Sequence, residues 1–197
     1  MTDRLAAAEA ILADLVGFAS ISGQPNGEIV NYIKTYLESF GIIVHLDKHE
    51  DGQRFNLFAS IGPQIDGGIL LSGHLDVVPA NPAGWSRDPF VLYKQDGRLY
   101  GRGAVDMKGF LAIALAMVPA FQEAASQFAK PVHLAFTFDE EVGSFGAAQM
   151  PSMLDRLDVK PAIALIGEPT GMKPFIGHKG GLELIADIRG TAGHASD

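Results

Sequence analysis

The sequence contains no cysteine, so disulfides and thiolate metal sites are excluded. Basic residues are also few: 15 Lys and Arg against 23 Asp and Glu give a net charge of −8. Because no basic stretch offsets this charge, nucleic acid and anionic membrane surfaces are not expected partners. The longest apolar run, 110–118, stops at Pro119, well short of the roughly 20 residues that span a bilayer.

Several enzyme motifs are missing as well. The sequence has no G-x-S-x-G, phosphate-binding loop, H-E-x-x-H or C-x-x-C. Its 47% hydrophobic content instead fits a well-packed soluble core. The first 18 residues carry acids within an apolar periodicity and lack the basic-then-apolar order of a signal peptide. An amphipathic helix and a cytoplasmic location are therefore expected.

Alternating helices and strands predict an α/β fold with a mostly parallel sheet flanked by helices. Helical periodicity covers 3–18 and 28–40, and a third helix over 108–121 is apolar on nearly every face and should be buried. A hairpin is predicted where Asp96-Gly97 joins 90–93 to 98–100. The other predicted strands are 42–46, 55–61, 69–72, 132–138 and 162–166.

Ligand-type side chains follow three of these strands. His74 and Asp76 come after 69–72, Glu140 and Glu141 after 132–138, and Glu168 after 162–166. Sites of open α/β sheets form outside the carboxyl ends of the strands. One imidazole and several carboxylates suit a divalent metal, with zinc the first choice, as one ion or as a pair. The sequence thus points to a metal-dependent hydrolase.

His74 and Asp76 lie on the same side of an extended segment, because side chains alternate with a period of two. His74 can bind a metal while Asp76 accepts its other ring N–H. Asp106 follows glycines that resemble a dinucleotide fingerprint, but it occupies the place of the third glycine, so a nicotinamide cofactor is rejected. Asp106 could bridge two metals or cap the following helix.

Asp139, Glu140 and Glu141 are three consecutive acids, which repel one another if buried without a cation. Either they form a solvated turn, or one glutamate ligates a metal while its neighbour handles protons. Glu168 could likewise belong only to a turn that faces water. Three histidines without an acidic partner pattern are predicted to be surface or packing residues: His45, His49 and His133.

Four stretches resemble, in order and spacing, motifs of the zinc aminoacylase and carboxypeptidase superfamily. They are SGHLDVVPA, GWSRDPFVLYKQDGRLYGRGAVDMKGFLA, FDEEVGSFGA and GEPTGMKPFIGHKG. The resemblance covers nearly the whole chain and favours the acetylornithine-deacetylating branch over the desuccinylating branch. It implies an N-acyl amino acid substrate, N-acetylornithine above all, and a zinc pair that cobalt can replace.

The resemblance also implies a role for each site residue. His74 and Glu168 would bind one zinc, Glu141 the other, and Asp106 would bridge both, just before a cis peptide bond to Met107. Glu140 would be the general base and Asp76 would orient His74. His194, in TAGHASD, would reach across a homodimer to stabilise the oxyanion of the opposite subunit.

In domain terms, the resemblance implies that 1–180 belong to the catalytic domain and that 181–197 begin a lid and dimerisation domain. Proteins of the superfamily are about twice this length, and their last zinc ligand, a histidine, would lie beyond Asp197. Two alternatives stay open: another acyl-amino-acid or dipeptide hydrolase of the superfamily, or a catalytically inactive fragment.

Overall fold

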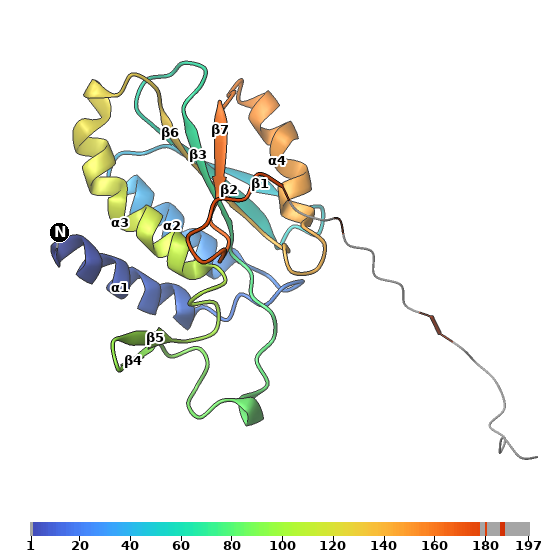
Figure 1. Cartoon of the computed structure of the whole chain (residues 1–197). Coiled ribbons are helices and arrows are strands. Elements are labelled where there is room, and N and C mark those ends of the chain that lie inside the picture. The colour runs from blue at the N-terminus through green and yellow to red at the C-terminus, as the bar shows by residue number, and fades with distance from the viewer. Residues whose placement is uncertain (1, 178–179, 181–185, 188–197) are drawn as a thin grey trace, which may run out of the picture.

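A computed structural model describes residues 2–177, 180 and 186–187, and its centre is a five-stranded sheet in the order β1-β2-β6-β3-β7 (Figure 1). β6, β3 and β7 are parallel, whereas β2 is antiparallel to both of its neighbours. All strands except β2 therefore run in one direction, which confirms the predicted fold class. The strands are β1 (Val44–Lys48), β2 (Phe55–Ile61), β3 (Ile69–His74), β6 (Val132–Thr137) and β7 (Ile163–Ile166).

Helices cover both faces of the sheet (Figure 1). On one face, α1 (Thr2–Gly17), α2 (Gly27–Glu38) and α3 (Lys108–Ala124) share the larger apolar core with β2 and β6. In α2 the buried residues Ile29, Ile33 and Leu37 recur every fourth position, as an amphipathic helix requires. On the other face, α4 (Phe145–Arg156) packs on a smaller core.

α3 continues through Pro119, where the sequence predicted the end of the apolar run. A proline inside a helix leaves the carbonyl four residues earlier without its N–H donor. That carbonyl belongs to Leu115, and the Tyr36 hydroxyl donates to it at 3.1 Å. By length and composition, Lys108–Gln127 could cross a membrane. It packs against α1 and β3 as a core helix does.

The first residue of α3 ties this helix to α1. Lys108 is completely buried, and its Nζ donates to the carbonyls of Leu15 at 2.9 Å and Phe18 at 2.7 Å, at the end of α1. Burial lowers the pKa of Lys108 to about 7, against the opposing charge of Asp76. These bonds fix the start of α3, and with it the loop that carries Asp106.

α4 was not predicted from the sequence. Its interior contains Pro151, and only Gly146, Met150 and Met153 are buried. The two methionines pack against Phe58 on β2 and its neighbours on the sheet. This helix is stabilised by tertiary packing rather than by a clear apolar periodicity.

The hairpin forms a separate two-stranded sheet of β4 (Tyr93–Gln95) and β5 (Arg98–Tyr100), and the short 3-10 helix η1 (Pro82–Gly84) precedes it in the chain. The prediction of β5 is confirmed, but placing the first strand at 90–93 was wrong. Asp88 accepts the Phe90 N–H with its side chain and the Val91 N–H with its carbonyl, so this segment is a turn. A second 3-10 helix, η2 (Ala125–Gln127), follows α3.

Candidate metal centre

His74 is the last residue of β3, and it is buried at the carboxyl end of the sheet. Its Nδ1 lies 2.8 Å from the backbone carbonyl of Asp76. Because a carbonyl can only accept, Nδ1 carries a proton and donates it. Nε2 is thereby free to act as the ligand atom.

The Nε2 atom of His74 faces two carboxylates. It lies 3.0 Å from Asp106 Oδ1 and 3.8 Å from Glu168 Oε1. With Nδ1 already protonated, a second proton or a cation must lie between Nε2 and these oxygens to avoid lone-pair repulsion. The geometry therefore favours either an imidazolium or a bound metal at this position.

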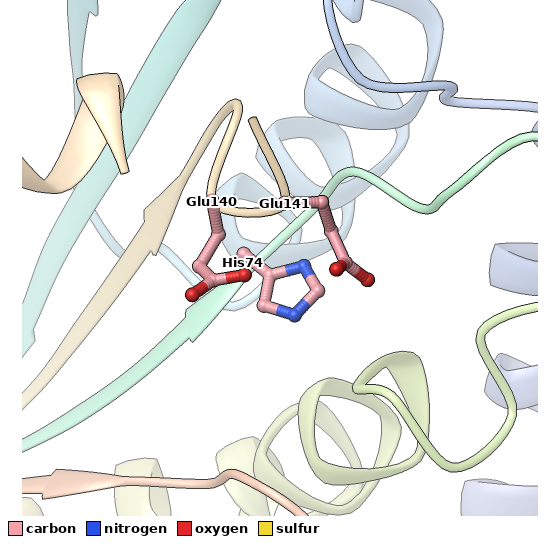
Figure 2. Close-up of side chains that lie close together, drawn as sticks. All are labelled: His74, Glu140 and Glu141. Carbon is pink, nitrogen blue, oxygen red and sulfur yellow. The ribbon is translucent and has the colours of Figure 1, made fainter. Parts of the chain in front are cut away.

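A second donor group shares the same imidazole. Figure 2 shows the carboxylates of Glu140 and Glu141 on two sides of the His74 ring. One ligand atom from each of these three side chains lies within 4.8 Å of the others, and the same holds for His74, Asp106 and Glu168. Both glutamates follow β6, and Glu168 follows β7, as the parallel topology predicts. Asp106 and Glu141, the expected ligands of a second ion, are not together in either group.

Asp76 has a different position from the one the sequence suggested. His74 Nδ1 donates its hydrogen bond to the backbone carbonyl of Asp76. The carboxylate Oδ1 of Asp76 lies 3.6 Å from the same nitrogen. The carboxylate instead accepts the N–H of Glu140 at 3.0 Å and that of Glu141 at 3.3 Å. Its other donor is the hydroxyl of Ser22, at 2.7 Å. Asp76 thus holds the turn that presents both glutamates.

Asp139, the first of the three acids, is 1% exposed, so a solvated turn is wrong for this residue. Its carboxylate pairs with Arg54 and accepts the Gly23 N–H at 2.7 Å. The opposite charge of Arg54 offsets the charge of Asp139 beside the two glutamates. Asp139 anchors the turn, and Glu140 and Glu141 remain available to the site.

Close packing fixes the strands that carry the ligands. A Cβ on Gly73 would lie 2.6 Å from the Met107 side chain, and a Cβ on Gly167 would lie 2.0 Å from the Phe110 ring. At Gly167 the rigid ring leaves no room for a side chain, whereas at Gly73 the ends of Met107 and Leu111 would have to shift. The peptide bond between Asp106 and Met107 is cis, which confirms that expectation. The N-cap of α3 is Met107 rather than Asp106, whose carboxylate contacts His74 instead.

The charges of the site shift its pKa values. Burial raises the pKa of Glu141 above its ordinary value, and the charge of Asp106 adds to this. Burial also raises the pKa of Glu168, against the opposing effect of His74. For His74, burial acts to lower the pKa, but Asp76 and the hydrogen bond to Asp106 raise it above its ordinary value. A bound cation would stabilise the deprotonated form of clustered carboxylates whose pKa values are raised in this way.

Sequence reasoning missed Ser22 and Arg54, which contact the site through bonds that span 54 and 85 residues. His133 hydrogen bonds to Ser60 and to the carbonyl of Gly67, away from the site. His45 lies against Phe58, and His49 contacts Asp51, Arg54 and Phe138. The prediction for His194 lies outside the described residues, as does most of 181–197.

The donor set fits a divalent metal. It combines one imidazole with carboxylate oxygens, the ligands that zinc takes in catalytic sites with an open position. The nitrogen opposite the ligand atom of His74 is fixed by a hydrogen bond, as metal-binding histidines require.

The chain is similar to known hydrolases along most of its length. Residues 70–181 match the model of peptidase family M20/M25/M40. The chain is 37% identical over 176 residues to the acetylornithine deacetylase of Proteus mirabilis (strain HI4320), covering 88% of this chain and 44% of that protein. The acetylornithine deacetylase of Yersinia pseudotuberculosis serotype O:1b (strain IP 31758) is 38% identical over 179 residues, with 88% and 45% covered.

Two solved structures share the fold at 26% sequence identity. Human carnosine dipeptidase 1 matches with a TM-score of 0.70 over 84% of this chain and 39% of that chain. The M20 family metallo-carboxypeptidase Sso-CP2 from Sulfolobus solfataricus matches with a TM-score of 0.67 over 81% of this chain and 37% of that one. The chain spans less than half the length of each of these relatives. By its family match and by its fold, it belongs to peptidase family M20/M25/M40.

Proposed function

We propose that this chain carries the metal-binding part of an amidohydrolase that converts N-acetylornithine and water into ornithine and acetate. The observation that carries the proposal is the position of His74 in two donor groups, one of which contains Glu140 and Glu141. The identity of 37–38% to acetylornithine deacetylases supports the choice of substrate.

The family resemblance supports a zinc pair, for which cobalt could substitute. His74 and Glu168 would hold one ion, Glu141 the other, and Asp106 would bridge them. When bound, such ions lower the pKa of water and polarise the acyl carbonyl. The cation would also neutralise the carboxylates whose burial raises their pKa values.

Glu140 is the residue left to move the proton. Its main chain is held by Asp76, and its carboxylate lies beside His74. In the proposed reaction, Glu140 takes a proton from the attacking water while the water oxygen bonds to the acetyl carbon. The C–N bond then breaks, and Glu140 returns the proton to the leaving amine, which gives ornithine and acetate. General acid–base catalysis of this kind contributes about 10²–10⁴-fold.

A dipeptide or another N-acyl amino acid is the second candidate substrate. The likeness to human carnosine dipeptidase 1, at a TM-score of 0.70, favours it. Both reactions break an amide bond at the same kind of site, so the fold does not choose between them. A third possibility is that the 197-residue chain by itself binds metal without hydrolysing anything.

The test is a substrate panel. The polypeptide that carries this sequence in its source is purified, loaded with zinc, and assayed with N-acetylornithine, N-succinyl-diaminopimelate and carnosine. N-Acetylornithine is expected to give the highest kcat/KM. Glu140→Gln should lower kcat by about 100-fold or more. The exposed Glu123→Gln on α3 is the matched control and should retain full activity. Faster cleavage of carnosine, or normal turnover by Glu140→Gln, would contradict the proposal.

The assembly of the whole protein is proposed from family resemblance. It would be a homodimer in which His194 of one subunit stabilises the oxyanion at the other subunit's site, and 181–197 would begin the lid. Light scattering on the source polypeptide tests the dimer. If it is a monomer with full activity, the role given to His194 is wrong.

A further inference from the structure

The segment between α1 and α2 lies against two loops of the candidate metal centre. The Ser20 hydroxyl donates to the Leu75 carbonyl at 2.6 Å, and the backbone carbonyl of Ser20 accepts the Val77 N–H at 2.9 Å. Ile21 forms a parallel bridge with Val77, and the Ser22 N–H donates to the Val77 carbonyl at 3.1 Å. The backbone of this segment is therefore fixed relative to the loop that follows His74.

The same segment reaches the turn after β6. The N–H of Gly23 donates to Asp139 Oδ1 at 2.7 Å. One short stretch of chain thus contacts both the loop that contains Asp76 and the turn that contains Glu140 and Glu141.

Ser22 lies where these two contacts meet. Its Oγ is 2.7 Å from Asp76 Oδ2 and 3.2 Å from the Val77 carbonyl. A hydroxyl has one proton to donate, and the nearer, charged acceptor forms the stronger bond. The hydroxyl proton therefore points to Asp76.

Asp76 is 3% exposed, and its two oxygens have separate partners. Oδ1 accepts the Glu140 N–H, whereas Oδ2 accepts both the Glu141 N–H and the Ser22 hydroxyl. Rotation of this carboxylate would break both bonds to the glutamate turn. The Ser22 hydroxyl is the donor that opposes such a rotation from the other side.

We infer that Ser22 is a positioning residue, which acts through Asp76 to hold Glu140 and Glu141 beside His74. The inference rests on the proposed function for its catalytic consequence, but its effect on metal binding does not require a known substrate. Ser22 contacts neither His74 Nε2 nor the carboxylates of the donor groups, so it is not a ligand.

Removing the hydroxyl should loosen the glutamate turn without removing a ligand. Outer partners of metal ligands affect metal affinity or activity by about 10–100-fold, and Ser22→Ala is expected near the lower limit, at about 10-fold. Ser22→Thr keeps the hydroxyl and should restore most of the loss. The matched control is Ser60→Ala, which removes a 2.7 Å serine hydrogen bond to His133 away from the site.

The experiment titrates Co²⁺ into the 197-residue wild type and the three variants, and follows the visible absorption of bound cobalt and the melting temperature without metal. The expected result is a Co²⁺ dissociation constant raised about 10-fold in Ser22→Ala, with an altered spectrum, and near wild-type values in Ser22→Thr and Ser60→Ala. If Ser22→Ala does not fold, Ser22→Cys, which is close in size and a weaker donor, is measured in its place.

An unchanged cobalt affinity and spectrum in Ser22→Ala would overturn the inference. If only the melting temperature of Ser22→Ala fell, the role of Ser22 would be purely structural. In the source polypeptide, Ser22→Ala should lower kcat with KM unchanged. If the wild type cleaves none of the substrates, the proposed function is wrong. The cobalt titration would still decide whether Ser22 positions the glutamates.

Discussion

The two sides of the candidate metal centre are supported very differently. The anchored side consists of Asp76, Glu140 and Glu141, and the open side consists of Asp106 and Glu168. Asp76 is 3% exposed and accepts three hydrogen bonds, two of them from the main chain of the glutamates. On the open side the side chains of Asp106 and Glu168 are 48% and 37% exposed. Among the described residues, the one side chain within hydrogen-bonding distance of either carboxylate is His74, through Nε2.

The ligands on the two sides are therefore held in position by different interactions. The anchored side is preorganised by the neutral donors to Asp76, and the pair of Arg54 with Asp139 holds the start of the same turn. The open side depends on packing behind it, by Met107 and Phe110, and on the cation itself for the final position of its carboxylates. His74 belongs to both sides, so its loss should affect them together.

The largest effect is expected for His74→Ala, which removes the ligand that both donor groups share. Since losing an outer partner already costs up to about 100-fold in affinity, losing the shared ligand should cost at least about 100-fold. Isothermal titration of zinc into the chain measures this. His45→Ala on β1 is the matched control and should bind zinc like the wild type. If His74→Ala bound zinc with the affinity of the wild type, His74 would not be the ligand that the anchored and open sides share.

Loss of a charge should lower the stability of the metal-free chain on the anchored side but not on the open side. Asp76→Asn weakens three bonds to a buried carboxylate and should lower the free energy of unfolding of the metal-free chain by about 3 kcal/mol. Asp106→Asn changes an exposed position and should stay within about 0.5 kcal/mol, while still weakening zinc binding. Urea unfolding and zinc titration separate the two effects. Similar stability losses in both variants would contradict the division.

Arg54→Met tests the anchored side from further away. It leaves the carboxylate of Asp139 buried with the Gly23 N–H as its remaining donor among the described residues. The expected loss is about 2 kcal/mol of unfolding free energy, because a buried charge loses its partner. Arg156→Met, which breaks an exposed pair with Asp47, is the control and should cost less than about 1 kcal/mol. Arg54 would have no anchoring role if both variants unfolded at the same urea concentration.

The smallest effect is a pH dependence. Burial raises the pKa of Glu141 and of Glu168 above 4.5, so the metal-free folded chain binds more protons than the unfolded chain just above that pH. Their contribution to stability is present below pH 4.5 and is lost as the pH rises through the raised pKa values. Zinc binds these carboxylates only when they are deprotonated, and it binds His74 only when Nε2 carries no proton. The rise in melting temperature caused by zinc should therefore be larger at pH 7.5 than at pH 5.5. Calorimetry at the two pH values measures it, and a larger rise at pH 5.5 would contradict the assignment.

Much of the site was predictable because its ligands follow strands. His74, Glu141 and Glu168 come shortly after three runs that the periodicity marked as strands, and parallel topology brings the ends of these strands together. The Asp106–Met107 cis bond and the ligand pattern came from family resemblance rather than from periodicity. The strand at 55–61 was predicted with its observed bounds.

The supporting contacts could not be predicted in this way. The bonds from Ser22 to Asp76 and from Arg54 to Asp139 join residues far apart in sequence, and no local pattern marks either pair. α4 contains Pro151 and forms because Met150 and Met153 bury against the sheet, which is a tertiary effect. The role of Asp76 differed for a similar reason: the loop after β3 turns its carbonyl, rather than its carboxylate, to the ring of His74.

The most direct test of the metal centre is diffraction from crystals grown with zinc, with anomalous differences measured at the zinc absorption edge. The structure predicts a peak at bonding distance from His74 Nε2, close to the carboxylates of Asp106 and Glu168. If a second ion is present, its peak should lie beside Glu141. A zinc-bound crystal with no peak near His74 Nε2, or with zinc held only at other histidines, would contradict the account.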